Sequence, residues 1–586
     1  MKCTGAQILI ALLEQQGISQ IAGIPGGANL PIYRALYDSS IRHILARHEQ
    51  GAGFIAQGMA RTTGKAGVCF ATSGPAATNL LTAIADAKLD SVPIVAVTGQ
   101  VPNSFIGSDA FQEVDVYGMS IPVTKHNFLV KRAIDLVSIV PEAFRIAEEG
   151  RPGPVLIDIP KDVQKEEIEI DESLLMKEKI SLAQSNSGIN AETGEDIALQ
   201  KGDNIETDKL VRLAGVINNA ERPVLYIGGG IQSSGAQNEL IAFAEKNNIP
   251  VVSTLMGIGT FPGDSSLYLG MLGMHGRAST NSILRKADLL LAFGVRFDDR
   301  ATGKVPEFAP NAKIAHIDID EAEIGKIKSA DYAVCADIKQ ALTIMIPYIT
   351  DNKRSEWHRT ISEIQQNFGD NPNNSLTIPQ DNTDPQCIMH AIHQAAGNDT
   401  IVVTDVGQHQ MWAAQFYPIV RPRQFLTSGG LGTMGFGLPA AIGAALANPE
   451  LKIVVISGDG SILMNLQEMA TLAEENLNIA VIILNNGALG LVRQQQELFY
   501  DAKYVASRFN AKPDFSIIAA GFGIRSYSIH KTDNTNEILS LAMAEKTPCV
   551  VDIEVPEEKN VYPMVPPGGA NHEMIGVNTC KPTETY

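Results

Sequence analysis

The chain has 586 residues, which is too long for a single hydrophobic core and indicates about three or four domains. Hydrophobic residues at 45%, together with 51 glycines, exclude a disordered or fibrous protein. The formal net charge of −19 argues against nucleic acid as the main partner, because phosphate binding needs a basic surface. An anionic substrate would need local basic groups to overcome this charge.

The cysteines and the first residues are typical of a cytoplasmic protein. The six cysteines are scattered without a CxxC pair, which indicates reduced thiols and no disulfide framework. The first apolar run is too short for a signal peptide. Thr4 and Gln7 instead predict a capping box and Gly17 a helix end, so we expect a folded N-terminal helix.

One uncharged stretch, residues 424–449, is long enough to cross a membrane. It contains many glycines and few large side chains, however. A glycine-rich loop that binds a ligand and leads into a packed helix is the better interpretation, and we expect no association with a membrane.

Short continuous apolar runs recur along the chain and predict strands buried on both faces, as in parallel sheets covered by helices. Helical patterns lie between them, so we expect βαβ units with ligands at the carboxyl ends of the strands. The predicted fold class is α/β, with three doubly wound domains and mostly parallel sheets. The runs include residues 68–71, 94–98, 155–159, 224–227, 289–293, 401–404, 453–456 and 479–484.

Two polar stretches interrupt this pattern and are interpreted as interdomain connections, residues 161–206 and 351–385. We therefore expect domains at residues 1–165, 206–348 and 385–556, followed by an irregular tail at residues 557–586.

The strongest signal is a pair of buried runs that end in small and oxygen-bearing residues, LKIVVISGDGS and NIAVIILNNGALG. Asp459 supplies a carboxylate and Asn486 an amide oxygen, at a spacing that suits one crossover helix at residues 466–475. Mg²⁺ prefers oxygen ligands and usually takes only one or two from the protein while it bridges phosphates. Gly458 and Gly460 allow backbone amides to approach a diphosphate. The alternative is two ordinary turns, since Asp-Gly and Asn-Gly commonly form them.

Together, the two runs resemble the GDG…NN signature of thiamine-diphosphate enzymes. The resemblance implies a diphosphate and Mg²⁺ site in the third domain. It implies that Mg²⁺ is held by Asp459, Asn486 and Ala488, and that the residues beside the cofactor include Gly460, Ser461, Gln408, His409, Gly432 and Met434. Met434 would hold the cofactor bent, and the Gly432 carbonyl would meet its aminopyrimidine. A lone histidine such as His409 is otherwise more often structural.

Activation of such a cofactor requires a carboxyl group that shuttles a proton on the aminopyrimidine, and burial that raises a carboxyl pKa suits this task. The candidate is Glu49 in RHEQGAGFIAQGMAR, where Gly51, Gly53 and Gly58 allow a helix to pack closely against a ligand or a neighbour. A glutamate chosen at random is far more often a solvated charge. Because Glu49 and the diphosphate site lie in different domains, the family pattern implies a site shared between two chains, and thus at least a homodimer.

Further segments resemble acetolactate synthases in the order of that family, among them GIPGGANLPIY, IGSDAFQE, GMLGMHG, GVRFDDRATG and VYPMVPPGG. The resemblance implies that pyruvate is decarboxylated on thiamine diphosphate and that the hydroxyethyl group passes to a second pyruvate, giving 2-acetolactate, or to 2-oxobutyrate. It also implies a small regulatory subunit. It implies that Gly27 lines the site and that Pro75 and Asn79 approach the aminopyrimidine. Phe111 and Gln112 would border the reacting carbon, and the substrate entrance would be lined by Lys161, Met274 and Arg300.

Arg300 is the candidate to bind the carboxylate of the second 2-oxo acid, because a guanidinium pairs with a carboxylate through two hydrogen bonds. Taken alone, a surface ion pair with Asp298 or Asp299 would be more probable. For Lys161, a solvated charge at the edge of a connection is the competing interpretation.

The middle domain is implied to bind FAD, as in the biosynthetic branch of the family, which the RFDDR segment favours. The overall reaction has no net redox step, so the flavin would be structural or vestigial. Its expected contacts are Arg151, His275, Gly294, Arg296, Asp318 and Asp337.

Three departures from the family stand out: Ala76 where glycine is usual, a longer first connection, and Gln495 where many members have tryptophan. Three alternatives remain open. The first is another thiamine-diphosphate enzyme, such as a pyruvate oxidase, a glyoxylate carboligase or a sulfoacetaldehyde acetyltransferase. The others are an NAD-dependent dehydrogenase that uses the glycines at 228–230, although GxGxxG is lacking there, and a non-catalytic partner on the same fold.

Overall fold

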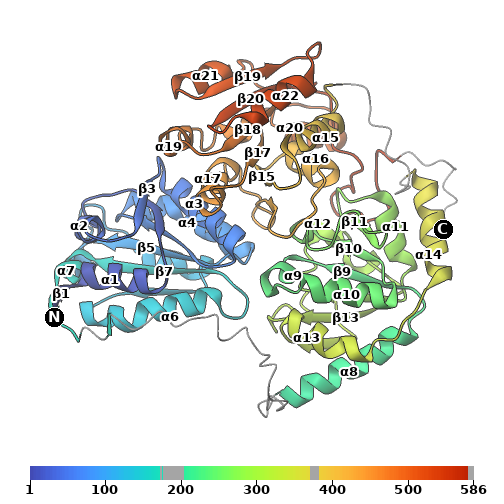
Figure 1. Cartoon of the computed structure of the whole chain (residues 1–586), viewed down its shortest axis with the longest axis horizontal. Coiled ribbons are helices and arrows are strands. Elements are labelled where there is room, and N and C mark those ends of the chain that lie inside the picture. Colours follow the sequence, from blue (N-terminus) through green and yellow to red (C-terminus); the bar gives the residue numbers. More distant parts are fainter. Residues whose placement is uncertain (172–173, 176–202, 370–381, 578–586) are drawn as a thin grey trace. The chain divides into compact units, whose positions relative to one another are not determined.

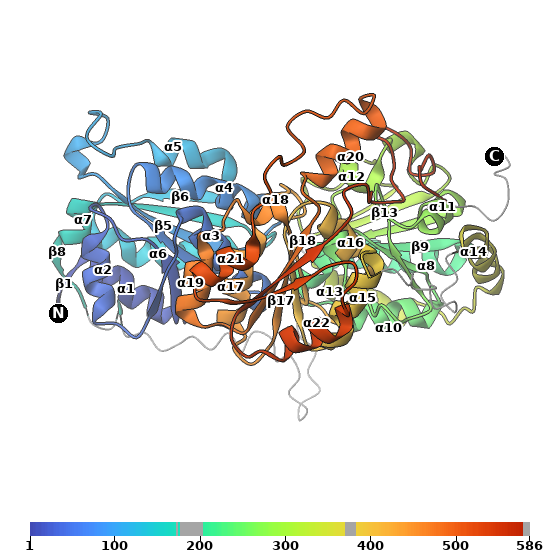
Figure 2. The same ribbon diagram turned by 90° about the horizontal axis from the view of Figure 1, so that it is seen from above.

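A computed structural model of the chain describes residues 1–171, 174–175, 203–369 and 382–577. It contains three six-stranded sheets, and the strand pairs of the first two are parallel, as the unbroken apolar runs predict. All eight runs form strands. The runs at residues 453–456 and 479–484, for example, are β17 (Ile453–Gly458) and β18 (Ile479–Asn485) in Figures 1 and 2. Among the residues that the structure describes, no helix combines the length and apolar character needed to span a bilayer.

The first sheet has the order β3-β2-β4-β5-β7-β6. Alternate strand residues such as Val68 and Val97 join the apolar faces of α1, α2 and α6 in one core. The strands are β2 (Gln20–Gly23), β3 (Arg42–Leu45), β4 (Gly67–Ala71), β5 (Ile94–Gln100), β6 (His126–Leu129) and β7 (Pro154–Pro160). The helices are α1 (Gly5–Gln15), α2 (Leu30–Tyr37), α3 (Glu49–Thr63), α4 (Pro75–Leu89), α5 (Val116–Ser120), α6 (Leu136–Glu148) and α7 (Lys161–Lys165).

The N-terminal helix α1 forms as the sequence predicts. The Thr4 side chain accepts a hydrogen bond from the Gln7 amide, and the Gln7 side chain accepts one from the Thr4 amide. Gly17 follows the helix with a φ of +80°, the left-handed conformation that glycine adopts most easily. The expected capping box and helix end are confirmed.

The second sheet has the order β11-β10-β9-β12-β13-β14. Its strands are β9 (Pro223–Ile227), β10 (Val251–Ser253), β11 (Tyr268–Met271), β12 (Leu289–Phe293), β13 (Lys313–Asp318) and β14 (Tyr332–Cys335). Its helices are α8 (Asp203–Asn219), α9 (Gly229–Ser234), α10 (Gln237–Asn247), α11 (Ala278–Lys286), α12 (Asp299–Thr302), α13 (Ile338–Met345) and α14 (Ser355–Phe368).

The third sheet has the order β16-β15-β17-β18-β20-β19. Its strands are β15 (Ile401–Thr404), β16 (Phe425–Leu426), β17 (Ile453–Gly458), β18 (Ile479–Asn485), β19 (Arg525–Ile529) and β20 (Cys549–Glu554). The helices are α15 (Pro385–Ala396), α16 (Gln408–Phe416), α17 (Gly437–Ala447), α18 (Asp459–Ile462), α19 (Glu468–Glu475), α20 (Gly490–Phe499), α21 (Phe515–Gly521) and α22 (Thr535–Ala544). The uncharged stretch is a loop that leads into buried α17, as expected.

The two stretches interpreted as connections are partly folded. Helix α7 lies at the start of the first stretch, where β8 (Glu167–Glu169) also pairs antiparallel with β1 (Lys2–Thr4). Helix α14 lies in the second stretch, and its Trp357 is buried and donates a hydrogen bond to the Pro223 carbonyl at 3.1 Å. The apolar residues of α14 are spaced helically at 357, 361 and 364, but the charged residues between them obscured this signal. The parts of these stretches at residues 172–173, 176–202 and 370–381 lie outside the described residues.

The chain separates into two compact units. The first is Met1–Leu199 with Gly430–Ile453 and Leu463–Ile479, and it contains the first sheet together with α17 and α19. The second is Gln200–Gly429 with Val454–Ile462 and Ala480–Tyr586, and it contains nearly all of the other two sheets.

Within the first unit, α3 and α17 pack against each other through glycines. A Cβ at Gly58 would lie 1.9 Å from the Ala440 carbonyl oxygen, and a Cβ at Gly443 would lie 1.9 Å from the Ile55 carbonyl oxygen. The two backbones are therefore in direct contact, and only glycine fits at either position. This confirms that the small residues of α3 allow close packing against a neighbour.

Gly58→Ala should therefore destabilise the protein by roughly 1–3 kcal/mol, because an added methyl group would overpack the helix pair. We expect a lower midpoint of thermal unfolding in calorimetry. Gly215→Ala is the matched control, since this helical glycine has open space around its Cβ position, and the midpoint should not fall. Equal midpoints for the two variants would contradict the close helix contact.

Candidate active site

The two expected metal ligands follow neighbouring strands in the middle of the third sheet. Asp459 comes directly after β17, and Asn486 directly after β18. The Asp459 carboxylate is buried and accepts a hydrogen bond from the Gly487 amide at 2.8 Å, so it reaches the turn that carries Asn486. The Asn486 amide oxygen lies in the same turn and accepts from the Ala488 amide at 3.2 Å. One carboxylate beside amide and backbone oxygens is a ligand set that suits Mg²⁺.

The electrostatics of Asp459 also suit a cation. Burial raises the pKa of Asp459 to about 6, while hydrogen bonds from the Gly487 and Gly460 amides act in the opposite direction. A divalent cation would stabilise the buried carboxylate in its charged form. Within the described ranges, no three or more His, Cys, Asp or Glu side chains gather around a possible metal position. A metal held by Asp459, Asn486 and phosphate oxygens would need no such cluster.

Gln408 and His409, at the start of α16, lie beside the expected metal ligands. Asn486 donates to the Gln408 side-chain oxygen at 3.1 Å, and His409 packs against Gly407 and Gly458. Burial lowers the pKa of His409 to about 3, so its imidazole is neutral. Its Nε2 atom is buried and has no hydrogen-bond partner in the protein. A polar ligand at this position would satisfy it, and the diphosphate is such a ligand.

Gly460 and Ser461 complete this part of the third domain. A Cβ at Gly460 would lie 2.6 Å from the Leu489 side chain, so the turn has no room for a larger residue. The Ser461 hydroxyl donates to the Val406 carbonyl at 2.6 Å, which joins the turn after β17 to the turn after β15. These two neighbouring strand ends thus form one surface.

Glu49, at the start of α3, lies beside two other expected site residues. Asn79 on α4 donates a hydrogen bond to Glu49 Oε2 at 3.0 Å. Pro75 begins α4, and Gly74 before it has a φ of +65°. A Cβ at Gly74 would lie 2.9 Å from Gln112 Cα, so the Gln112 backbone packs against the start of α4. The structure therefore brings Glu49 and Asn79 together, and Pro75 together with Gln112.

The exposure of the other expected residues of the first unit varies. Gln112 has a φ of +59°, a conformation that is uncommon outside glycine and recurs at functional sites. Phe111 beside it is 88% exposed. Gly27 is exposed in the turn after β2, and Lys161 is the half-buried first residue of α7.

The loop that carries Gly432 and Met434 is held by hydrogen bonds to buried carboxylates of the same unit. Asp86 accepts from the Thr433 hydroxyl and Asp90 from the Gly430 amide, each at 2.7 Å. Arg61 donates to Asp90 at 2.7 Å. Gly432 has a φ of +69°, so the loop needs glycine there.

Met274 and Arg300 meet in the second unit. The Met274 amide donates to the Arg300 carbonyl at 2.8 Å, and Arg300 Nη1 lies 3.7 Å from the Met274 sulfur. The Arg300 side chain is 65% exposed, and its Nε is 3.8 Å from the Asp299 carboxylate. The Asp298 carboxylate accepts from the backbone amides of Arg300 and Ala301 and caps α12. The competing ion pair is thus present but loose, which leaves donors of the guanidinium for a substrate carboxylate.

Most of the residues expected to contact FAD follow adjacent strands of the second sheet. Gly294 and Arg296 come after β12, Asp318 ends β13, and Asp337 follows β14. These strands are parallel and adjacent, so the four residues lie at one edge of the sheet. Carboxylates and a cation along one edge fit the hydroxyls and phosphates of a dinucleotide.

The other two residues expected to contact FAD, His275 and Arg151, do not follow β12, β13 or β14. His275 is buried, and burial lowers its pKa to about 4. Its Nδ1 lies 3.4 Å from the Pro563 carbonyl, and the Val565 amide donates to the Met274 carbonyl at 2.8 Å, so the tail lines this segment. Arg151 belongs to the first unit, where its Nε donates to the Ser91 hydroxyl at 2.8 Å.

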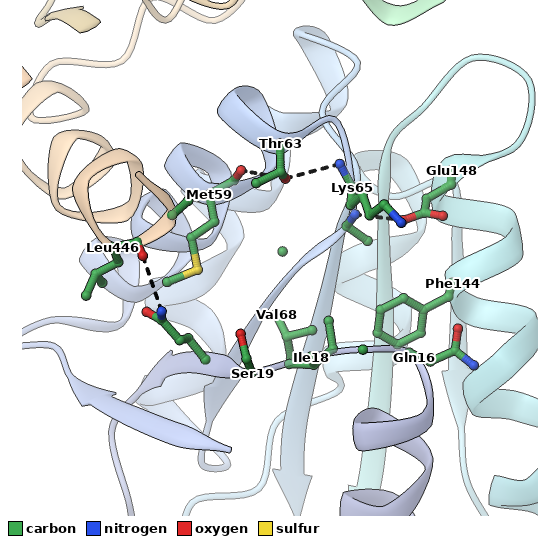
Figure 3. Close-up of a pocket in the computed structure, with 15 residues that line it drawn as sticks. Gln16, Ile18, Ser19, Met59, Thr63, Lys65, Val68, Phe144, Glu148 and Leu446 are labelled. Atoms are coloured by element: carbon green, nitrogen blue, oxygen red, sulfur yellow. Dashed lines mark hydrogen bonds between the residues drawn. The ribbon is translucent and has the colours of Figure 1, made fainter. Parts of the chain in front are cut away.

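A separate cavity of about 300 Å³ lies in the first unit, near the amino ends of β2 and β4 (Figure 3). Ile18, Lys65, Phe144, Glu148 and Leu446 are among the residues that line it. Glu148 accepts from the Ala66 amide at 2.8 Å, which gives this carboxylate a structural role. None of the expected site residues lines the cavity.

Comparison with known proteins agrees with this geometry. Residues 3–119, 210–345 and 405–553 match the N-terminal TPP binding, central and C-terminal TPP binding domains of thiamine pyrophosphate enzymes. The chain is 51% identical over 576 residues to the acetolactate synthase isozyme 1 large subunit of Escherichia coli (strain K12), covering 98% of each chain. The chain belongs to the acetolactate synthase family. Family membership also accounts for the fold, an α/β architecture with three domains.

Other members of the family agree. The chain is 45% identical to acetolactate synthase 1, chloroplastic, of Oryza sativa subsp. japonica, covering 97% of this chain and 87% of the relative. It is also 45% identical to the acetolactate synthase large subunit of Parasynechococcus marenigrum (strain WH8102), covering 98% and 91%. Membership excludes the NAD-dependent dehydrogenase, and the glycines considered for it have a packing role. A Cβ at Gly230 would lie 2.5 Å from Gly294 Cα.

Sequence reasoning missed Gln494, which supports the diphosphate side of the site. This glutamine of α20 is fully buried and accepts from Gln408 at 3.0 Å and from the Val561 amide at 2.8 Å. The glutamine-rich run around it resembled a solvated surface. No apolar pattern in the sequence marked it as buried, because Arg493, its buried neighbour on the helix, is also polar. Gln495 beside it is exposed.

If Asp459 ligates the metal, Asp459→Ala should leave the protein folded, because it removes a costly buried charge, but should abolish retention of thiamine diphosphate at ordinary Mg²⁺ concentrations. Calorimetric titration with the cofactor measures this. Asp552→Asn is the control. Asp552 lies near Asp459 on β20, so this substitution changes the local electric field. Asp552 does not follow β17 or β18, the strands after which the expected metal ligands lie. Unchanged cofactor affinity in Asp459→Ala would show that Asp459 does not bind the metal.

Proposed function

We propose that this protein is an acetolactate synthase, which decarboxylates pyruvate and joins the remaining two-carbon unit to a second 2-oxo acid. With pyruvate as acceptor the products are 2-acetolactate and carbon dioxide, and 2-oxobutyrate is the other acceptor. The observation that carries the proposal is the Glu49 carboxylate, bonded to Asn79, in a chain that also sets Asp459 and Asn486 after neighbouring strands. These are the groups that the chemistry of this family needs.

Thiamine diphosphate, when bound with Mg²⁺, supplies a carbon nucleophile and an electron sink for the decarboxylation. Asp459, Asn486 and the backbone oxygen of Ala488 would hold the metal. The residues that would hold the diphosphate and shape the bent cofactor are Gln408, His409, Gly460, Ser461, Gly27, Pro75, Gly432 and Met434.

Glu49 would exchange a proton with the aminopyrimidine, and Asn79 would orient its carboxylate through the hydrogen bond to Oε2. Gln112 would donate a hydrogen bond to the oxyanion that develops on the substrate carbonyl, and Phe111 would exclude water beside it. In support, Gln112 has a positive φ and its backbone packs against Gly74.

Arg300 would bind the carboxylate of the second 2-oxo acid, with Met274 packed against it and Lys161 adding positive charge at the entrance. The guanidinium pairs only loosely with Asp299, so it can form two hydrogen bonds with a substrate at small cost. FAD would be held structurally by Arg151, His275, Gly294, Arg296, Asp318 and Asp337, because the reaction has no net redox step.

The assembly is part of the proposal. Glu49 lies in the first unit and the metal ligands in the second, and the pattern of the family favours a homodimer or larger assembly with each site built from two chains. The names of relatives as large subunits support a small regulatory subunit. The domain boundaries proposed from the sequence, residues 1–165, 206–348 and 385–556 with a tail from 557, and a cytoplasmic location complete the proposal.

Incubation with pyruvate, Mg²⁺ and thiamine diphosphate, with and without FAD, tests the function. We expect one carbon dioxide per 2-acetolactate and no consumption of oxygen. Acetyl phosphate or acetate with hydrogen peroxide would instead identify a pyruvate oxidase, and a different condensation product another carboligase of this fold.

Glu49→Gln keeps the shape of the side chain but cannot carry a proton, and a positioned acid–base group contributes about a hundredfold to ten-thousandfold in rate. We expect correspondingly slow exchange of the thiazolium C2 proton of the bound cofactor, measured by NMR, while FAD content stays unchanged. Exchange at the wild-type rate would show that Glu49 does not activate the cofactor.

Gln495 should reduce discrimination between the two acceptors. Tryptophan, common at this position in the family, offers an apolar face, on which one extra methylene is worth roughly 1–3 kcal/mol. The Gln495 amide favours water over an ethyl group. In a competition between pyruvate and 2-oxobutyrate, we expect little preference in the wild type and a shift toward 2-oxobutyrate in Gln495→Trp.

The competing interpretation is that Gln495 is only a solvated helix residue, in line with its exposure in the single chain. Strong preference for 2-oxobutyrate in the wild type, or an unchanged product ratio in Gln495→Trp, would favour that interpretation.

A further inference from the structure

Glu468, the first residue of α19, has a buried carboxylate that accepts hydrogen bonds from the backbone just before Glu49. It is fully buried in the first unit. Its Oε1 atom accepts hydrogen bonds from the Arg47 amide at 2.9 Å and from the His48 amide at 3.0 Å. These are the two amides that precede Glu49, where the chain enters α3.

The other carboxylate oxygen of Glu468 also has a hydrogen-bond partner, and Gly51 makes room for the carboxylate. Glu468 Oε2 accepts from the Thr471 hydroxyl at 2.7 Å. A Cβ at Gly51 would lie 2.4 Å from Glu468 Oε1, so glycine at 51 is what allows the carboxylate to reach the two amides. The Arg47 side chain pairs with Glu474 instead, which leaves the backbone amides as the main partners of Oε1. A carboxylate is costly to bury, so an apolar residue would serve the packing alone at lower cost.

Asn465 forms a hydrogen bond with the residue that follows Glu49. Its Nδ2 donates to the Gln50 side chain at 3.3 Å and to the Gly435 carbonyl at 2.8 Å. The residue after Glu49 is thereby joined to the residue after Met434, and both lie in the first unit. Glu468 and Asn465 together hold the chain on both sides of the Glu49 carboxylate.

We propose that Glu468, assisted by Asn465, is a positioning residue for Glu49. It fixes the position of the Glu49 carboxylate relative to the aminopyrimidine. This inference rests on the proposed role of Glu49 in cofactor activation. Proton transfer requires hydrogen-bond distance, and a misplacement of about 1 Å can cost on the order of a hundredfold in rate. Glu468 acts through the backbone and touches neither substrate nor cofactor.

Two substitutions separate position from charge. Glu468→Asp keeps the charge but is one methylene too short to reach the Arg47 and His48 amides. Glu468→Gln loses the charge but keeps an oxygen at the same reach, and the Thr471 hydroxyl can turn to accept from its amide. Glu474→Gln is the matched control on the same helix, because Glu474 contacts only the Arg47 side chain among these residues.

The first measurement is amide hydrogen exchange across residues 46–54 of the cofactor-free chain. The second is exchange of the C2 proton of thiamine diphosphate in the holoenzyme. We expect Glu468→Asp to speed amide exchange and to slow C2 exchange by about tenfold to a hundredfold, with cofactor affinity and FAD content within about twofold. Glu468→Gln should stay within about threefold of the wild type, and Glu474→Gln should match it.

The proposal is overturned if Glu468→Asp exchanges the C2 proton at the wild-type rate, or if Glu468→Gln is as slow as Glu468→Asp, which would make charge the cause. Slow exchange in Glu49→Gln beside normal exchange in Glu468→Asp would reject only this inference. Normal exchange in Glu49→Gln would reject the proposed activator itself. If Glu468→Asp does not fold, Asn465→Ala supplies the same test from the other side of Glu49, and the same two rates decide it.

Discussion

Strands that are buried on both faces can carry polar chemistry only at their ends, and this constraint organises the whole chain. In the parallel sheets the carboxyl ends of neighbouring strands lie at one edge. That edge holds Asp459 and Asn486 in the third sheet, and Gly294 and Asp318 in the second. In the first sheet, the segment after β3 leads directly to Glu49. The metal and flavin parts of the proposed site thus follow from the apolar runs, whereas Glu49 follows β3, a largely exposed edge strand.

Close packing of helices fixes the residues at those edges. Within the first unit, α3 contacts α17 backbone to backbone through Gly58 and Gly443, and Phe54 of α3 meets Phe436 edge to face at 5.3 Å. A helix held this tightly along its length cannot shift along its axis without breaking these contacts. The first residue of α3 is Glu49, so the packing of glycines far along the helix contributes to the position of a proton-transfer group.

The sequence predicted the strands well where they are continuous and apolar, because that pattern depends only on local composition. Exposed edge strands such as β3 and β19 carry polar residues and gave no such signal. Helix α14 was hidden by its charged face. Glu468 and Gln494 were missed for a different reason: each is a polar residue that only tertiary packing buries. The Asp459 and Asn486 pair was accessible because each residue directly follows a strand that the apolar pattern reveals.

The claim on which this account depends is that Asp459 and Asn486 bind the metal that holds the cofactor at the carboxyl edge of the third sheet. The most direct test is a crystal structure of the holoenzyme with Mn²⁺ in place of Mg²⁺, with anomalous scattering used to locate the metal. We expect one strong peak per chain, about 2.1 Å from an oxygen of Asp459 and of Asn486 and bound to the diphosphate. Bound cofactor with the metal peak at other residues, or with no peak beside Asp459, would contradict it.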